Sequence, residues 1–81
     1  MPFTETQSLT IAENTMQLTI NGKPFDFSVG NTVQHLLEQL HLAARPVAVE
    51  RNGHIVPHST FAQAELSEGD ILEVVTLVGG G

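Results

Sequence analysis

The hydrophobic and polar positions of residues 16–20 (MQLTI) alternate, and this period of two predicts a half-buried strand. Asn21-Gly22 follows, a pair that favours a type I′ hairpin turn because both central residues of such a turn have positive φ. Residues 23–29 alternate again and form the expected return strand. Because Pro24 has no N–H to donate to a neighbouring strand, we expect this strand at an edge of the sheet.

Residues 33–40 change to a helical period, with apolar side chains at the first, fourth, fifth and eighth positions. This spacing places one apolar stripe on a helix of about three turns. Asn31 or Thr32 can cap its first turn by accepting a backbone N–H bond, and Asn31 with Gln34 resembles a capping box. Residues 43–46 are expected to end the helix, since the residue before a proline avoids the α region.

The second half of the chain predicts further strands. Residues 47–51 form an expected third strand, Asn52-Gly53 a second tight turn, and residues 54–57 a continuation or a short return strand. Residues 59–66 are expected to form a loop with a helical turn. Residues 71–78 are almost continuously apolar, which favours a central strand with neighbours on both sides.

These elements predict an α+β fold of two layers. The simplest arrangement packs the one main helix across one face of a mixed sheet of four to five strands, with the first and last strands side by side at its centre. That arrangement is the β-grasp, or ubiquitin-like, fold. We expect a flexible N-terminal extension over residues 1–15, the β-grasp domain over 16–78 and a flexible glycine tail over 79–81.

Composition narrows the classes of function. The 81 residues fit one domain, and the absence of cysteine excludes disulfides, thiolate nucleophiles and zinc–thiolate sites. Nine acidic residues against three basic ones give a formal charge of −6, so no basic patch for nucleic acid is expected. The sequence has neither a long apolar run nor a signal-peptide pattern. We therefore expect a cytoplasmic protein without a membrane segment, monomeric when free.

The tail Gly79-Gly80-Gly81 directly follows the most apolar segment. Glycine loses more conformational entropy on ordering than any other residue and has no side chain to pack, so it contributes little to a fold here. A glycine tail can instead enter a narrow channel and present the carboxylate at its tip. Considered alone, the tail is equally compatible with a frayed chain end.

Other candidate chemistry is weaker. The four histidines (His35, His41, His54 and His58) do not have metal-ligand spacing, and the first two are expected on the solvent side of the helix, so we predict no metal site. Glu68 and Asp70 could pair as catalytic carboxylates. They lie, however, in a Ser-Glu-Gly-Asp segment typical of a turn, which is the favoured interpretation.

Together these features resemble the ThiS family of ubiquitin-like sulfur carriers in thiamine biosynthesis. The resemblance covers all of the chain except the first 15 residues, which depart from the family pattern. The matching segments are residues 16–23, 31–33, 36–37, 47–53, 55–57, 68–75 and 78–81.

The resemblance implies a reaction at the chain's own C-terminus. An adenylating enzyme would use ATP and magnesium to activate the carboxylate of Gly81, and sulfur from a donor protein would convert it to a thiocarboxylate. Thiazole synthase would then receive the sulfur. By the same resemblance Gly80 matches the second glycine of the family's paired ending, and Gly79 is common in this branch but not required, so we expect it to act as a spacer. The chain has no phosphate-binding motif, so it is expected to be a substrate rather than an enzyme and to bind no cofactor itself.

One strand face is a candidate docking surface. Glu73 should face water, which places Ile71, Val75 and Leu77 on the same outer face, leading to the tail. These residues could dock the adenylating enzyme, or they could simply reflect a central strand. The docking hypothesis requires Val75 to be exposed rather than buried against the helix.

Three alternatives to the thiamine carrier remain. A related carrier could serve molybdopterin or another sulfur metabolite, although the short core and the Thr76-Leu77-Val78 segment before the glycines favour thiamine. A protein conjugator would join Gly81 to target lysines. A β-grasp interaction module would leave the tail inert.

Overall fold

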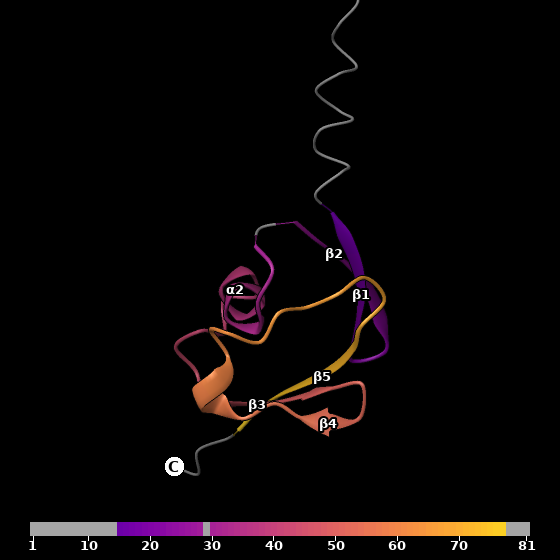
Figure 1. Cartoon of the computed structure of the whole chain (residues 1–81). Coiled ribbons are helices and arrows are strands. Elements are labelled where there is room, and N and C mark those ends of the chain that lie inside the picture. Colours follow the sequence, from indigo (N-terminus) through magenta and orange to yellow (C-terminus); the bar gives the residue numbers. More distant parts are fainter. Residues whose placement is uncertain (1–14, 29, 78–81) are drawn as a thin grey trace, which may run out of the picture.

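The computed structural model describes residues 15–28 and 30–77. Its sheet curves around one face of a helix, giving two layers (Figure 1). The sheet has five strands in the order β2-β1-β5-β3-β4. The elements along the chain are β1 (Met16–Ile20), β2 (Lys23–Phe27), α2 (Val33–Gln39), β3 (Val47–Arg51), β4 (His54–Ile55), the 3-10 turn η1 (His58–Thr60) and β5 (Ile71–Thr76).

Strand β5 lies at the centre of the sheet. It pairs in parallel with β1, with Thr19 opposite Ile71, and antiparallel with β3, with Val49 opposite Val74. The predicted central last strand, the edge position of β2 and the mixed β-grasp sheet are thus confirmed. Two strands end earlier than predicted, β2 at Phe27 and β5 at Thr76, and residues 29 and 78 lie outside the described part of the chain.

Thr32, one of the two predicted cap residues, caps helix α2, but the capping box pairs it with His35 rather than Asn31 with Gln34. The Thr32 hydroxyl accepts from the backbone N–H of His35 at 3.2 Å, and His35 Nδ1 accepts from the N–H groups of Thr32 and Asn31 at 3.3 and 3.1 Å. The predicted Asn31–Gln34 pair is therefore wrong. His35 is half-buried rather than simply facing solvent, because its ring folds back over the helix start.

The helix is also shorter than predicted. It ends at Gln39, with His41 in the left-handed region at φ 63°. The His41 N–H donates to the Glu38 carbonyl at 3.1 Å and the Leu42 N–H to the Leu37 carbonyl at 2.8 Å, the paired bonds of a Schellman motif. This motif stops the helix before the segment 43–46, where the sequence placed its end.

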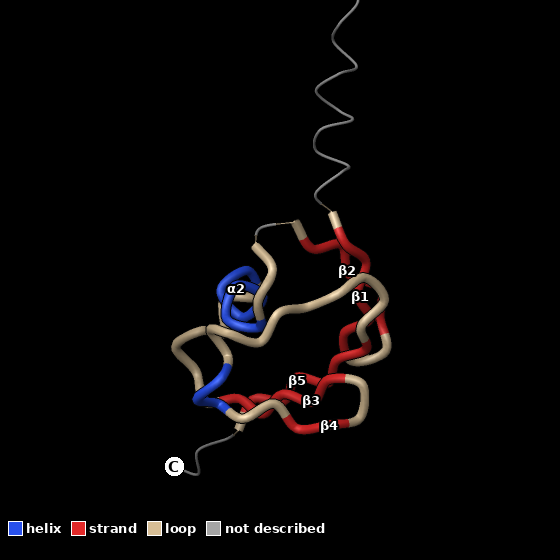
Figure 2. The backbone as a smooth tube through the Cα atoms, viewed as in Figure 1, coloured by secondary structure: helices blue, strands red, loops and turns tan. Residues whose placement is uncertain are grey.

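The loop between η1 and β5 supports the helix. The N–H groups of Val33 and Gln34, which have no partner within α2, donate to the carbonyls of Ala64 and Phe61 at 2.9 and 3.0 Å. Figure 2 shows this loop in tan, passing beside α2. A helix of seven residues is too short to be stable alone, so these bonds and its buried face hold it in place.

The core lies between the helix and the concave face of the sheet. It draws residues from both layers and from the loop, so the predicted packing of one helix on one sheet face is confirmed. The buried apolar residues are Leu18, Phe27, Val33, Leu36, Leu37, Val47, Val49, Phe61, Leu66, Leu72 and Val74. Among the described residues, no helix is long and apolar enough to cross a membrane.

Candidate docking face and carboxyl end

The asparagine side chains of the two Asn-Gly turns hydrogen-bond to the central strand β5 and its first flanking residue, an arrangement that we call the clamp. The Asn21 side chain accepts from the Val74 N–H at 2.8 Å and donates to the Val74 carbonyl at 3.0 Å. At the start of β5, Asn52 Oδ1 accepts from the Ile71 N–H at 2.9 Å and Asn52 Nδ2 donates to Asp70 Oδ1 at 3.0 Å. The sequence predicted these turns from their φ angles, but not that their side chains would bind a strand distant in sequence.

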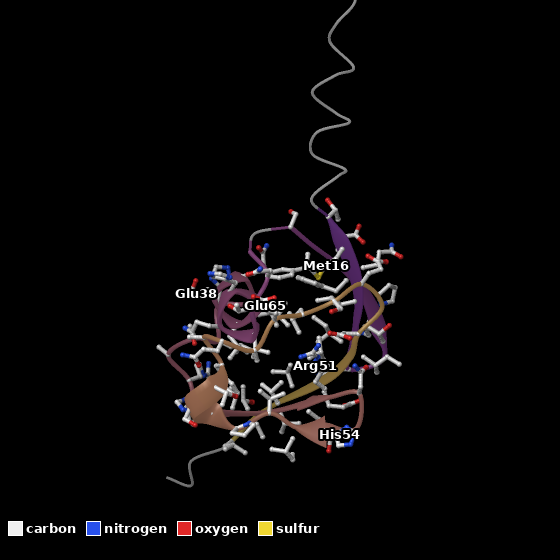
Figure 3. All side chains as sticks on the ribbon, viewed as in Figure 1. Met16, Glu38, Arg51, His54 and Glu65 are labelled. Atoms are coloured by element: carbon white, nitrogen blue, oxygen red, sulfur yellow. The ribbon has the colours of Figure 1, made fainter. Side chains whose placement is uncertain are left out.

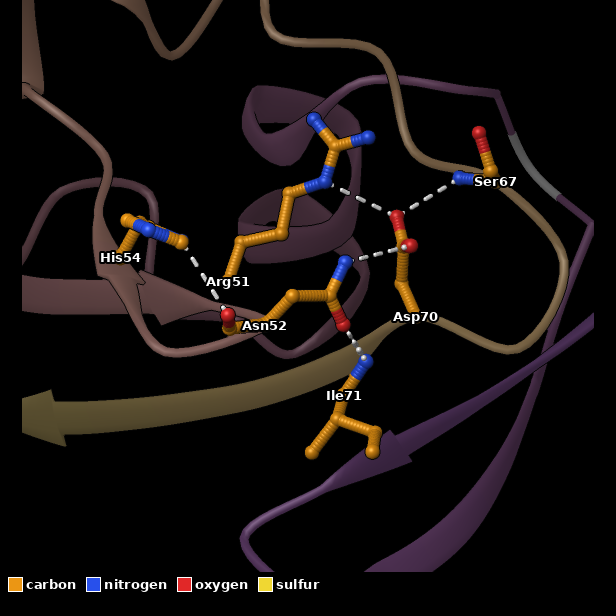
Figure 4. Close-up of polar contacts among 6 residues, drawn as sticks. All are labelled: Arg51, Asn52, His54, Ser67, Asp70 and Ile71. Carbon is orange, nitrogen blue, oxygen red and sulfur yellow. Dashed lines mark hydrogen bonds and ion pairs between the residues drawn. The ribbon is translucent and has the colours of Figure 1, made fainter.

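Asp70 is a buried structural carboxylate. Its Oδ2 lies 3.0 Å from Arg51 Nε and accepts from the Ser67 N–H at 2.8 Å (Figure 4). Glu68 turns elsewhere and accepts from the Gln17 N–H at 2.9 Å. The turn interpretation of the Glu68–Asp70 segment is confirmed, because each carboxylate is engaged with backbone N–H groups rather than with the other. Within the described ranges no three His, Cys, Asp or Glu side chains cluster as metal ligands.

The convex, outer face of the sheet carries an apolar patch. Leu72 and Val74 point into the core, whereas Ile71, Val75 and Leu77 are 55, 54 and 50% exposed. The exposure predicted for these three side chains is confirmed, and their docking role stays a prediction. Ile55 of β4, 67% exposed, joins them, and we call these four residues the outer patch. Sequence reasoning missed Ile55 because a strand of two residues has no recognisable period.

A shallow hollow lies within the outer patch, over β3, β4 and β5. Strand register explains its position: Glu50 of β3 is opposite both Ile55 of β4 and Glu73 of β5, and Ala48 is opposite Val75. The residues lining the hollow are Ala48, Val49, Glu50, Ile55, Glu73 and Val75. Two carboxylates thus stand side by side on a surface that is otherwise largely apolar.

Strand β5 leads directly toward the glycines. Thr76 lies opposite Val47, and the Leu77 N–H donates to the Pro46 carbonyl at 2.8 Å, which fixes the chain up to the last described residue. Gly79, Gly80 and Gly81 lie outside the described residues, so their predicted roles remain predictions. The outer patch borders the end of the chain from which they continue.

This topology, with one helix cradled by a mixed sheet whose central strand leads to the glycines, defines a ubiquitin-like β-grasp protein. The model of the ThiS family matches residues 18–81. The chain belongs to the ThiS family.

Solved and curated relatives agree with this assignment. The crystal structure of the thiamine biosynthesis protein ThiS from Geobacter metallireducens has a TM-score of 0.68 and 36% identity, covering 82% of this chain and all of that one. The sulfur carrier protein ThiS of Bacillus subtilis is 37% identical over 65 residues, which are 79% of this chain and 98% of that protein. The name of the first of these proteins places it in thiamine biosynthesis, and that of the second describes a sulfur carrier.

A second kind of relative is much longer. The thiazole synthase of Paramagnetospirillum magneticum is 50% identical over 66 residues, covering 82% of this chain. The chain spans only about 20% of the length of that synthase, and the same holds for the thiazole synthase of Magnetococcus marinus, at 41% identity. A segment similar to this chain is therefore part of proteins that bear the name of the synthase.

Proposed function

We propose that the protein is the sulfur carrier for synthesis of the thiazole of thiamine and that the carboxyl group of Gly81 carries the sulfur. The observation that carries this proposal is the family match, which extends through the glycine tail to residue 81. The fold supports it, because a central strand fixed by hydrogen bonds on both sides gives the tail a rigid base.

The proposed chemistry starts from a poor electrophile. A carboxylate resists attack because oxide would have to leave, so a Gly81 oxygen first attacks the α-phosphate of ATP and pyrophosphate departs. The resulting acyl-adenylate has AMP as a good leaving group. The outer sulfur of a persulfide on the donor protein then attacks the carbonyl carbon, and AMP leaves with the former carboxylate oxygen, which gives an acyl disulfide. A thiol of the partner proteins next attacks the donor's sulfur and breaks the S–S bond, so that the thiocarboxylate is released and the thiol and the donor sulfur are left joined as a disulfide.

This activation belongs to a partner enzyme that binds ATP and magnesium. The sequence contains no P-loop and no Gly-x-Gly-x-x-Gly motif, so the chain lacks the usual means of holding phosphates. The chain acts as the substrate of that adenylating enzyme. Gly80 leaves clearance beside the reacting carboxyl group, because a side chain there would widen the tail, and Gly79 acts as a spacer.

The outer patch is the proposed docking surface for the adenylating enzyme. Ile71, Val75 and Leu77 are about half exposed and lie on one face of β5, and contiguous exposed apolar patches occur at protein interaction surfaces. The patch borders the base of the tail, so docking there would bring the Gly81 carboxyl group toward the partner's active site.

Thiazole synthase is the proposed acceptor of the sulfur. The two thiazole synthases that contain a segment similar to this chain support this acceptor over a molybdopterin enzyme or a protein conjugate. The acceptor would take up the thiocarboxylate sulfur and release the carrier with its carboxylate restored.

The test is incubation of the chain ending at Gly81 with the cognate adenylating enzyme, a sulfur donor, and ATP with magnesium, followed by intact-mass spectrometry. The proposal predicts a mass gain equal to replacement of one oxygen by sulfur, dependent on ATP. Addition of thiazole synthase and its substrates should reverse the gain. An unchanged mass with competent partners would contradict every carrier function, and a conjugate with a target protein would favour the conjugator.

A further inference from the structure

A like-charge pair lies at the centre of the outer patch. Glu50 and Glu73 are directly opposite each other on the antiparallel strands β3 and β5, a relation that brings Cβ atoms to about 5 Å. Both carboxylates line the same hollow. Like charges directly opposite in a sheet destabilise it, so the fold carries a cost at this position.

The described part of the chain offers these two carboxylates no cation. Neither glutamate forms an ion pair or a side-chain hydrogen bond within residues 15–28 and 30–77. Arg51 is the nearest basic residue in sequence, but its Nε lies 3.0 Å from Asp70 on the other side of the sheet. The chain as a whole has only three basic residues against nine acidic ones.

Apolar side chains surround the pair. Ile55 is opposite Glu50 in the same row across the sheet, and Val75 follows Glu73 on the outer face of β5. When a partner covers these side chains, water is excluded and the effective dielectric constant around the carboxylates falls. An unpaired carboxylate would then be strongly unfavourable, whereas one paired with a cation would be favoured.

We infer that the hollow receives a basic side chain of the adenylating enzyme, flanked by apolar residues that cover the outer patch. Arginine fits best, because its planar guanidinium can donate to both carboxylates while its flat face rests on aliphatic side chains. The inference rests on the proposed function, since it specifies the chemistry of the partner that docks on the same face. Charge complementarity, rather than the apolar area alone, selects the occupant.

The first experiment replaces both carboxylates with amides of nearly the same shape, in the variant Glu50→Gln/Glu73→Gln. The matched control, Glu38→Gln/Glu65→Gln, changes the net charge equally at two exposed positions that Figure 3 shows on the α2 side of the molecule. The readout is the carrier concentration that half-saturates thiocarboxylate formation by the adenylating enzyme, measured at low and high salt, with the melting temperature as a check on folding.

We expect Glu50→Gln/Glu73→Gln to raise the half-saturating concentration about tenfold at low salt, to lose most of the salt dependence and to melt no lower than the wild type. The maximal rate at saturating carrier should be unchanged, since Gly81 is intact. The control pair should remain within about twofold of the wild type, because distant charges contribute only to steering.

A second variant tests the same inference without introducing a glutamine amide, which could itself form hydrogen bonds with the partner. Glu73→Lys places a cation opposite Glu50, so the strand pair should be stabilised while the hollow repels a basic side chain. We expect a higher melting temperature together with a greater loss of affinity than in the amide variant.

The inference would be overturned if the Glu50→Gln/Glu73→Gln variant had the same half-saturating concentration and salt dependence as the control variant or as the wild type. The proposed function would still stand in that case if the wild-type chain acquires sulfur on incubation. If the wild-type chain acquires none, the proposed function fails first.

Discussion

The side chain of Asn21 forms two hydrogen bonds with the backbone of Val74, accepting from its N–H at 2.8 Å and donating to its carbonyl at 3.0 Å. These residues are 53 positions apart in the sequence. The amide continues the parallel ladder between β1 and β5 beyond the last paired residues, Ile20 and Leu72. A hairpin turn thus also holds the strand that leads to the glycine tail.

Replacement of Asn21 by glycine should therefore destabilise the fold. Glycine tolerates the positive φ of this position, 51°, so the turn survives while both bonds to Val74 are lost. We expect the free energy of unfolding to fall by about 1–2 kcal/mol in denaturant titrations, since each bond contributes about 1 kcal/mol. Asn21→Asp keeps only the acceptor and should also destabilise. A glycine variant as stable as the wild type would show that the clamp contributes nothing.

The start of α2 depends on a close contact between Gly30 and His35. Gly30 has φ 129°, and a Cβ atom built there would lie 2.4 Å from the His35 ring. Gly30→Ala should therefore destabilise the fold by more than 1 kcal/mol, and His35→Ala by about 1 kcal/mol through loss of the capping box.

A double-mutant cycle tests this contact. In the His35→Ala background the ring is absent, so Gly30→Ala should cost distinctly less than in the wild type, leaving only the penalty of the backbone angle. Thermal or denaturant unfolding measures all four proteins. Strict additivity of the two substitutions would contradict the contact.

The tautomer of His35 can be tested separately. Nitrogen chemical shifts should place the proton of the neutral His35 ring on Nε2, because Nδ1 accepts hydrogen bonds from two backbone N–H groups.

The sequence predicted those features that depend on short-range patterns. Strands β1 and β3 have the bounds that were predicted from the sequence pattern, residues 16–20 and 47–51. The Asn-Gly pairs correctly indicated both tight turns. The end of α2 was not predictable in this way, because His41 adopts a left-handed conformation that usually requires glycine.

Features that depend on the register between strands distant in sequence could not be predicted from the sequence. Glu50 and Glu73 are ordinary strand residues in the sequence, and only the pairing of β3 with β5 places them together. The same holds for Arg51, whose guanidinium meets Asp70 across the turn region. The candidate docking residues on β5 were predictable because a single exposed position, Glu73, fixes the face of its neighbours at a period of two.

Introduction of a charge into the outer patch tests its role in docking. Val75 is 54% exposed, so Val75→Asp should leave the fold intact and lower the free energy of unfolding by no more than about 1 kcal/mol, the cost of an aspartate in a strand beside Glu73. It should weaken binding to the adenylating enzyme at least about tenfold, because an aspartate would be desolvated at an apolar contact. Gln63→Asp, at an exposed position of the loop after η1, provides a charge-matched control outside the patch. Binding of the Val75→Asp variant with wild-type affinity would place the docking surface elsewhere.

The tail makes a separate prediction. Gly80→Val and deletion of Gly81 should leave the melting temperature unchanged, since neither residue follows directly on the described core, and both should abolish or severely reduce activation. In Gly80→Val the carboxylate remains but the tail is too wide for a narrow channel, whereas in the deletion the reacting carboxyl group is displaced by one residue. Pyrophosphate release with the adenylating enzyme measures the effect, and wild-type rates in both variants would exclude a role for the tail.

The most direct test of the carrier function is fragmentation mass spectrometry of the protein after incubation with the adenylating enzyme, ATP, magnesium and a sulfur donor. The account predicts that one oxygen is replaced by sulfur and that the added mass lies on the fragment containing Gly81. Sulfur on any other residue, or no added mass in the presence of active partners, would contradict it.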